Sequence, residues 1–168
     1  TVTDAAEAPI FTSAAAVTVN EGESAVATLN ATDPDAGSTL TYSISGGADA
    51  GLFTIDAQTG ALRFTSAPDY EAKADANHDN VYDVQVAVSD GGLTTTRAMT
   101  VTLANVAPTI TSAATVAMAE NSLLATTVQA TDPAGGTLVY ALAGGADANL
   151  FAIDSVTGAL SFRSAPNY

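Results

Sequence analysis

The chain has 168 residues, with eighteen Asp and Glu against four Lys and Arg, a formal net charge of −14, and neither Cys nor Trp. This negative field repels nucleic acid and anionic membranes and attracts divalent cations. The lack of cysteine excludes a fold held by disulfides and excludes thiolate chemistry. No apolar run has the length of a membrane span and no signal-peptide pattern begins at Thr1, so we expect an internal segment of a longer protein, without membrane insertion.

An internal repeat organises the sequence. The tetrapeptide Ala-Thr-Asp-Pro at 31–34 returns at 130–133, a spacing of 99 residues, and Gly-Gly-Ala-Asp-Ala at 46–50 returns at 144–148, a spacing of 98. A fixed period of this kind is typical of tandem domains. We therefore predict three parts: the end of the last strand of a preceding repeat at 1–8, a complete repeat at 9–107, and an incomplete repeat at 108–168 that lacks its last two strands.

Apolar and polar residues alternate within the complete repeat, which is the pattern of half-buried strands. The side chains predicted to face the core are, in chain order, Leu40, Tyr42, Ile44, Phe53, Ile55, Leu62, Phe64, Tyr82, Val84, Val86, Val88, Met99, Val101 and Leu103. Glycine-containing turns at 56–60 and 89–92 separate these runs, because glycine tolerates the positive φ of hairpin turns. No stretch shows a sustained helical period. About seven short strands in each repeat predict an all-β antiparallel sandwich.

A local candidate for a metal site is the loop at 75–80, Asp-Ala-Asn-His-Asp-Asn. Asp75, Asn77 and Asp79 place oxygen-bearing side chains at alternate positions, which is the spacing of the first half of an EF-hand loop. The glycine and the glutamate that complete an EF-hand loop are absent. The alternative interpretation is a solvated turn in which Asp and Asn side chains cap their own backbone. Both interpretations stay open at this point, with calcium as the expected ion.

Three motifs follow one another in the complete repeat: F-x-I-D-x-x-T-G-x-L at 53–62, P-D-Y-E at 68–71 and Y-x-V-x-V-x-V-x-D at 82–90. Together they resemble the cadherin repeat and, more narrowly, the cadherin-like repeats of large bacterial surface and secreted adhesins. The resemblance covers the first repeat and the retained part of the second. It implies tandem seven-stranded antiparallel Ig-like (cadherin-like) β-sandwich repeats, the second of them truncated.

The same resemblance implies calcium ions between successive repeats. Matched position by position, the implied ligands are Glu21, Asp69, Glu71, Asn105 and Asp132 at the junction near Pro108, Asp4, Glu7, Asp33 and Asp35 at the junction near Pro9, and Glu120 as the second repeat's counterpart of Glu21. The linker at 103–108 has lost its acidic residues, and Asp132 is not followed by a second aspartate two positions later. We therefore expect fewer ions per junction than in the vertebrate pattern.

No arrangement in the sequence predicts catalysis, because His78 has no neighbouring nucleophile and no serine stands in a G-x-S-x-G setting. We expect a non-enzymatic stalk or adhesion module that is secreted or attached to the cell surface. Its expected partners are neighbouring repeats of the same chain and a homophilic or strand-donating protein.

Two alternatives remain. A polysaccharide-binding module would use an exposed aromatic platform, although Tyr42, Phe53, Phe64 and Tyr82 occupy inward positions. A subunit of a self-assembling filament or surface layer would use the open sheet edge of the incomplete repeat to receive a donated strand.

Overall fold

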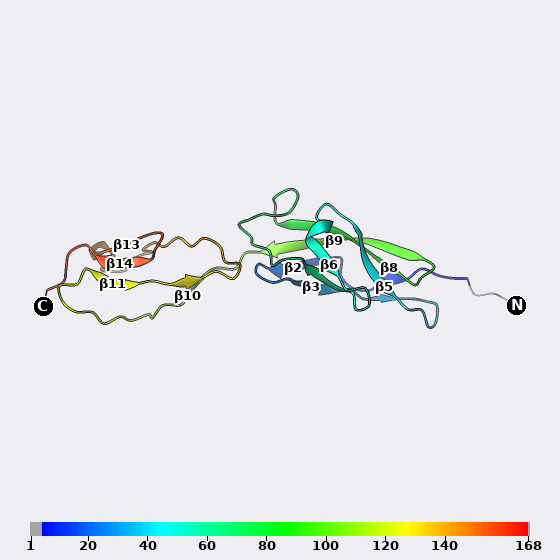
Figure 1. The fold of residues 1–168 in the computed structure, drawn as a ribbon, viewed down its shortest axis with the longest axis horizontal. Helices are drawn as coiled ribbons and strands as arrows, with labels where there is room; N and C mark the ends of the chain where they lie inside the picture. The colour runs from blue at the N-terminus through cyan, green and yellow to red at the C-terminus, as the bar shows by residue number, and fades with distance from the viewer. Residues whose placement is uncertain (1–4, 168) are drawn as a thin grey trace. The chain divides into compact units, whose positions relative to one another are not determined.

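The computed structural model describes residues 5–167, which divide into two compact units with the boundary between Asn105 and Val106 (Figure 1). Within the described residues, each unit has short β-strands and one short 3₁₀ helix. This all-β architecture agrees with the predicted fold class. No helix among the described residues is long and apolar enough to cross a bilayer.

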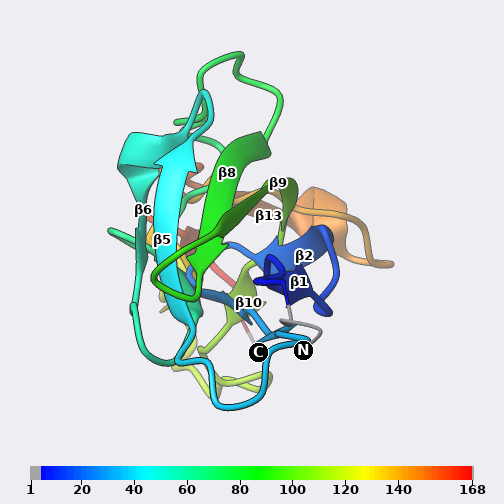
Figure 2. The same cartoon turned by 90° about the vertical axis from the view of Figure 1, so that its right-hand side faces the viewer.

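The described part of the first unit contains nine strands and one 3₁₀ helix. They are β1 (Ile10–Phe11), β2 (Ala16–Asn20), β3 (Ala25–Thr28), β4 (Ala31–Thr32), β5 (Thr41–Gly46), η1 (Ala50–Leu52), β6 (Phe53–Ile55), β7 (Ala61–Phe64), β8 (Val81–Ser89) and β9 (Thr94–Ala104). A four-stranded sheet has the order β2-β9-β8-β5, and these strands lie side by side in Figure 2. A three-stranded sheet has the order β3-β7-β6, and β1 pairs with β4.

One strand pairing differs from the antiparallel prediction. β2 runs parallel to β9, with Val17 opposite Val101, whereas the remaining pairs described in this unit are antiparallel. The chain first pairs β1 with β4, breaks at 12–15, and then reaches the edge of the four-stranded sheet running in the direction of β9. Side-chain alternation is the same in both directions, so the pattern carries no information on strand direction. The prediction of a wholly antiparallel sandwich is therefore wrong at this edge.

The core of the first unit lies between its two larger sheets. Buried members of the predicted inward set are Tyr42, Phe53, Leu62, Phe64, Tyr82, Val84, Val86, Val88, Met99, Val101 and Leu103, while Leu40, Ile44 and Ile55 pack against them half-buried. The rings of Phe53 and Phe64 stack with centroids 4.6 Å apart, and the Tyr82 ring meets Phe64 edge-on at 5.1 Å. Tyr70 also packs against this cluster. The inward assignment is confirmed, and core packing accounts for these aromatic residues.

The second unit contains fewer strands. They are β10 (Thr109–Ile110), β11 (Leu124–Thr127), β12 (Ala130–Thr131), β13 (Phe151–Ile153) and β14 (Ala159–Phe162), with the 3₁₀ helix η2 (Ala148–Leu150) before β13. Each element begins 98 or 99 residues after its counterpart in the first unit. Segments 115–119 and 139–144, the counterparts of β2 and β5, form no strand because the described part of this unit has no counterpart of β8 and β9 to pair with them.

Candidate calcium sites

Three carboxylates gather where the chain leaves the first unit. The N–H of Glu21, just after β2, donates to the carbonyl oxygen of Ala104 at the end of β9, with a distance of 3.0 Å. Asp69 and Glu71 lie in the loop after β7. One carboxylate oxygen from each of these three acids lies within 4.8 Å of the other two. Asn105, the last residue of the unit, donates from its Nδ2 to Oε1 of Glu71 at 2.8 Å.

Backbone donors hold this exit trio in place. Glu21 is only 2% exposed, and its Oε2 accepts the N–H of Tyr70 at 3.2 Å. Oδ1 of Asp69 accepts the N–H of Glu71 at 2.9 Å and the N–H of Ala72 at 3.2 Å, which fixes the turn that carries both acids. Three negative groups at this separation repel one another, and a divalent cation between them reverses that repulsion.

A second trio lies where the chain enters the first unit. Asp33 and Asp35 follow β4, Asp90 lies in the turn between β8 and β9, and one oxygen of each lies within 4.8 Å of the other two. The N–H of Asp35 donates to Oδ1 of Asp33 at 2.8 Å, and the N–H of Glu7 donates to Oδ2 of Asp35 at 3.0 Å. Oδ2 of Asp33 is buried and has no hydrogen-bond partner among the described residues. A buried carboxylate oxygen without a partner is costly, and a bound cation removes that cost.

Asp90 is a member of this entry trio that the sequence analysis did not assign to a site. Its Oδ1 accepts the N–H of Leu93 and the N–H of Gly92, each at 2.6 Å. These hydrogen bonds, that from Leu93 most of all, lower the pKa of Asp90, so its carboxylate is ionised at neutral pH. The glycines beside Asp90 marked it as a turn residue. The sequence feature that could have identified Asp90 as a candidate ligand is its position as the last residue of the Y-x-V-x-V-x-V-x-D motif.

Both trios fit a hard divalent cation. Calcium binds oxygen at 2.3–2.6 Å, so two oxygens on one ion lie no more than about 5 Å apart. The separation of at most 4.8 Å in each trio meets this condition. Calcium takes six to eight oxygens, and carboxylates bound through both oxygens, backbone carbonyls and water would complete the set. Neither trio contains histidine or cysteine, the ligands that favour zinc.

The other predicted junction ligands have different surroundings. Asp4 lies outside the described residues. Glu7 has an exposed side chain and contributes its backbone N–H to Asp35. In the second unit, Asp132 uses Oδ1 to accept two backbone N–H groups of its own loop, and Glu120 is exposed. Their roles as ligands remain predictions.

The loop at 75–80 uses its first carboxylate to cap its own backbone. Asp75 is 1% exposed, and its oxygens accept the N–H of Asp79 at 2.8 Å and the N–H of Asn80 at 3.1 Å. Burial raises the pKa of Asp75, and these hydrogen bonds lower it. Together the hydrogen bonds have the larger effect, so the pKa of Asp75 lies below its ordinary value. Nδ2 of Asn77 donates to Oδ2 of Asp79 at 2.9 Å. A calcium ion in this loop remains a prediction, and the geometry is that of a side-chain-capped turn.

Comparison with known proteins assigns the first unit to one family. The family described as Cadherin domain matches residues 15–106, which is more than half of the chain. The chain belongs to the cadherin domain family. The resemblance of the three motifs to the cadherin repeat is thereby confirmed.

Individual relatives agree with this assignment. Halomucin from Haloquadratum walsbyi is 40% identical over 72 residues, and human Protocadherin Fat 4 is 40% identical over 73 residues. These matches cover 40% and 42% of the chain, but only 1% of each relative. The crystal structure of human Protocadherin-24 EC1-2 superposes with a TM-score of 0.54 at 24% identity, covering 98% of this chain and 81% of that one. The Protocadherin gammaB7 EC3-6 cis-dimer structure gives 0.51 at 22% identity, covering 96% and 45%.

Membership of this family has functional consequences. Cadherin domains are extracellular modules with structural and adhesive roles, they are not enzymes, and they typically bind calcium. The two carboxylate trios are acidic groups that could hold such an ion. The chain spans about 1% of the length of each of these two curated relatives.

Proposed function

We propose that this chain is a calcium-binding segment of a longer bacterial surface or secreted protein, in which cadherin domains follow one another as tandem repeats and form a stalk or a cell-adhesion module. The observation that carries the proposal is the buried Oδ2 of Asp33, which has no hydrogen-bond partner among the described residues and lies in a trio with Asp35 and Asp90. A calcium ion supplies the charge and the coordination that this oxygen lacks.

The positions of the two trios support a role at the junctions between domains. Asp90 precedes the start of β9, and Glu21 is bonded to Ala104 at its end. An eleven-residue strand spans about 33 Å, so the trios are too far apart to share an ion. Glu7 contacts the entry trio and Asn105 contacts the exit trio. Ions at both places would therefore tie the incoming and the outgoing chain to the unit, which restricts bending as a stalk requires.

Glycan binding has less support in the first unit. A glycan platform needs exposed aromatic faces, whereas Phe53, Phe64 and Tyr82 are at most 4% exposed and Tyr42 is 9% exposed. Neighbouring domains of the same chain are therefore the partners that we propose.

Thermal unfolding in calcium and in chelator tests the proposal. An ion that binds only the folded state stabilises it by about 2.7 kcal/mol at a concentration 100-fold above Kd, so calcium should raise the melting temperature of the chain. Asp33→Asn and Asp90→Asn should each reduce this rise. Glu23→Gln is the matched control, because Glu23 is an exposed acid outside both trios. A melting curve that is the same in calcium and in chelator would reject the calcium function.

A further inference from the structure

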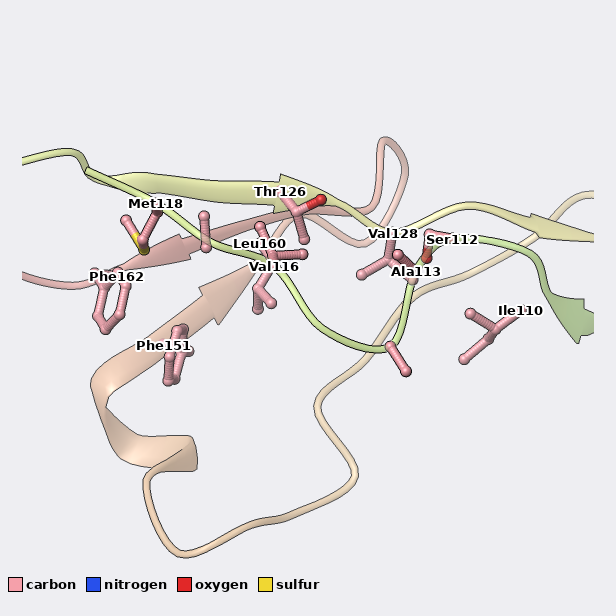
Figure 3. Close-up of a pocket in the computed structure, with 12 residues that line it drawn as sticks. Ile110, Ser112, Ala113, Val116, Met118, Thr126, Val128, Phe151, Leu160 and Phe162 are labelled. Carbon is pink, nitrogen blue, oxygen red and sulfur yellow. The ribbon is translucent and has the colours of Figure 1, made fainter.

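The second unit contains an apolar groove of about 670 Å³, and Figure 3 shows Phe151 and Phe162 close together at one end of it. In the first unit, their counterparts Phe53 and Phe64 pack against the Tyr82 ring of β8, with centroids 6.2 and 5.1 Å away. The groove is therefore the face that β8 covers in the first unit, so it belongs to the fold and not to a ligand site.

A buried asparagine in the first unit has a different character. Asn80 is 3% exposed and lies where the loop after β7 meets β8, with a left-handed φ of +63°. Its N–H donates to Oδ1 of Asp75 at 3.1 Å, and its carbonyl oxygen accepts the N–H of Leu103 on β9 at 2.9 Å. Its side chain donates from Nδ2 to the carbonyl oxygen of Tyr70 at 3.0 Å. Asn80 therefore joins the end of β9 to the turn that carries two acids of the exit trio.

The carbonyl that Asn80 holds belongs to the peptide group between Tyr70 and Glu71. The N–H of the same peptide group, that of Glu71, donates to Oδ1 of Asp69 at 2.9 Å. Both polar groups of this peptide are thus fixed, one by Asn80 and the other by a carboxylate of the exit trio. Rotation of the peptide plane would break both bonds. Asn80 therefore fixes the orientation of the Asp69 carboxylate and the backbone position of Glu71.

The third acid of the exit trio is held by the same turn. The N–H of Tyr70 donates to Oε2 of Glu21 at 3.2 Å, and the Tyr70 ring packs half-buried against the core. Tyr70 thus uses one backbone group to hold Glu21 and the other to accept the bond from Asn80. A change in the position of this residue would alter the separation of the carboxylates, which repel one another.

The choice of asparagine carries a cost. Oδ1 of Asn80 is buried and has no hydrogen-bond partner among the described residues. A buried polar atom without a partner is unfavourable. Glycine would adopt the same left-handed φ without burying a polar atom. The bond that Nδ2 donates to Tyr70 is the contribution that glycine could not make, which points to a role for this donor.

We propose that Asn80 is a positioning residue for the exit trio, and that its Nδ2 hydrogen bond raises the affinity of the trio for calcium. Calcium affinity depends on the rigidity of the ligands as well as on their charge. Carboxylates whose backbone is already fixed lose less conformational freedom when the ion binds. The inference rests on the proposed calcium function, and it adds that a residue outside the trio sets the affinity of one of the two sites.

Calcium titration of the full chain, followed by amide chemical shifts in NMR spectra, tests this role. The signals of the exit trio and those of the entry trio report the two sites separately in one molecule. Asn80→Gly keeps the left-handed backbone and both backbone hydrogen bonds and removes the side-chain donor. We expect it to raise the Kd for calcium at the exit trio at least ten-fold and to change the Kd at the entry trio less than two-fold.

His78→Gly is the matched control. It places glycine at another left-handed residue of the same loop, with φ +62°. Nδ1 of His78 lies 2.6 Å from the carbonyl oxygen of Lys73, so its loss removes a side-chain contact from the loop without touching the bond to Tyr70. We expect the Kd at both trios to stay as in the wild type.

Hydrogen exchange in the unsubstituted chain gives a second measurement that does not depend on the folding of Asn80→Gly. Coupling between two sites is reciprocal, so calcium at the exit trio should stabilise the bonds made by Asn80. We expect calcium to slow the exchange of the N–H of Asn80 and of Leu103, the second of which donates to Asn80. This slowing should remain in Asp90→Asn and disappear in Glu21→Gln.

The outcomes separate this inference from the proposed function. An exit-trio Kd that is unchanged in Asn80→Gly, an equal loss of affinity at both trios, or exchange at Asn80 and Leu103 that calcium leaves unaltered would overturn the positioning role while calcium binding stands. A wild-type chain that binds calcium at neither trio would overturn the proposed function and the positioning role together.

Discussion

The guanidinium carbon of Arg97 lies 4.4 Å from the centre of the Phe11 ring. From β9, Nη1 of Arg97 donates to the carbonyl oxygen of Ser13 at 2.6 Å, and Nη2 donates to Oγ of Ser13 at 3.1 Å. These contacts hold the segment between β1 and β2, where the chain crosses from one sheet to the other. Arg97 therefore stabilises the crossing that places β2 parallel to β9.

Replacing Arg97 should weaken the first unit. Loss of hydrogen bonds from a charged donor and of a cation–π contact predicts that Arg97→Ala lowers the free energy of unfolding by about 2–3 kcal/mol. Arg97→Lys should have an intermediate effect, because lysine keeps the charge but lacks the planar fork of donors. Urea titration followed by near-UV circular dichroism measures both. Arg63 is exposed, so an Arg63→Ala effect as large as that of Arg97→Ala would contradict the assigned role.

A matched pair of glycine substitutions measures the contact with β8. Gly47→Ala and Gly145→Ala introduce the same side chain at similar positive φ, +110° and +119°, but only Gly47 faces a nearby strand backbone. Overpacking adds about 1–3 kcal/mol to the backbone strain that the two variants share. We expect Gly47→Ala to destabilise the first unit strongly and to speed hydrogen exchange in β8. Gly145→Ala should leave the unfolding of the first unit unchanged, and equal effects of the two variants on that unfolding would contradict the contact.

The Asp75 carboxylate should make the stability of the first unit depend on pH. Its folded-state pKa is lowered, so its contribution is fully present above the unfolded pKa of about 3.9 and is lost as the pH falls through the folded pKa. At pH 7, Asp75→Ala should lower the free energy of unfolding by about 2–3 kcal/mol, because the backbone N–H groups of Asp79 and Asn80 lose a charged acceptor. The difference from wild type should shrink below pH 4 in urea titrations. Asn77→Ala, an exposed change in the same loop, should leave this pH dependence intact.

The two carboxylate trios should bind calcium independently, because about 33 Å of β9 separates them. Glu21→Gln should remove one binding event in isothermal titration, and Asp90→Asn should remove another. The double variant should lose both, with additive effects, as expected for sites that are far apart and share no ligand. A single substitution that abolishes all calcium binding would show that the trios are coupled.

Much of the fold could be predicted from local pattern. The alternation of Tyr82, Val84, Val86 and Val88 identified the buried face of β8, because the faces of a strand repeat every two residues. Glu21, Asp69 and Glu71 lie close together in the structure, a spatial relation that their spacing in the sequence does not contain and that only the family resemblance suggested. The direction of β2 could not be predicted, because alternation does not distinguish parallel from antiparallel pairing.

The sequence by itself determined the internal repeat, the resemblance to the cadherin family and the inward side chains of the first unit. Only the tertiary structure decided that Asp90 joins Asp33 and Asp35, and that both oxygens of Asp75 accept bonds from its own loop. It also decided that Asp49 binds backbone donors that its counterpart Asp147 lacks in the described unit. The physical reason is that periodicity acts over neighbouring residues, whereas these groups meet only where distant strand ends and loops come together.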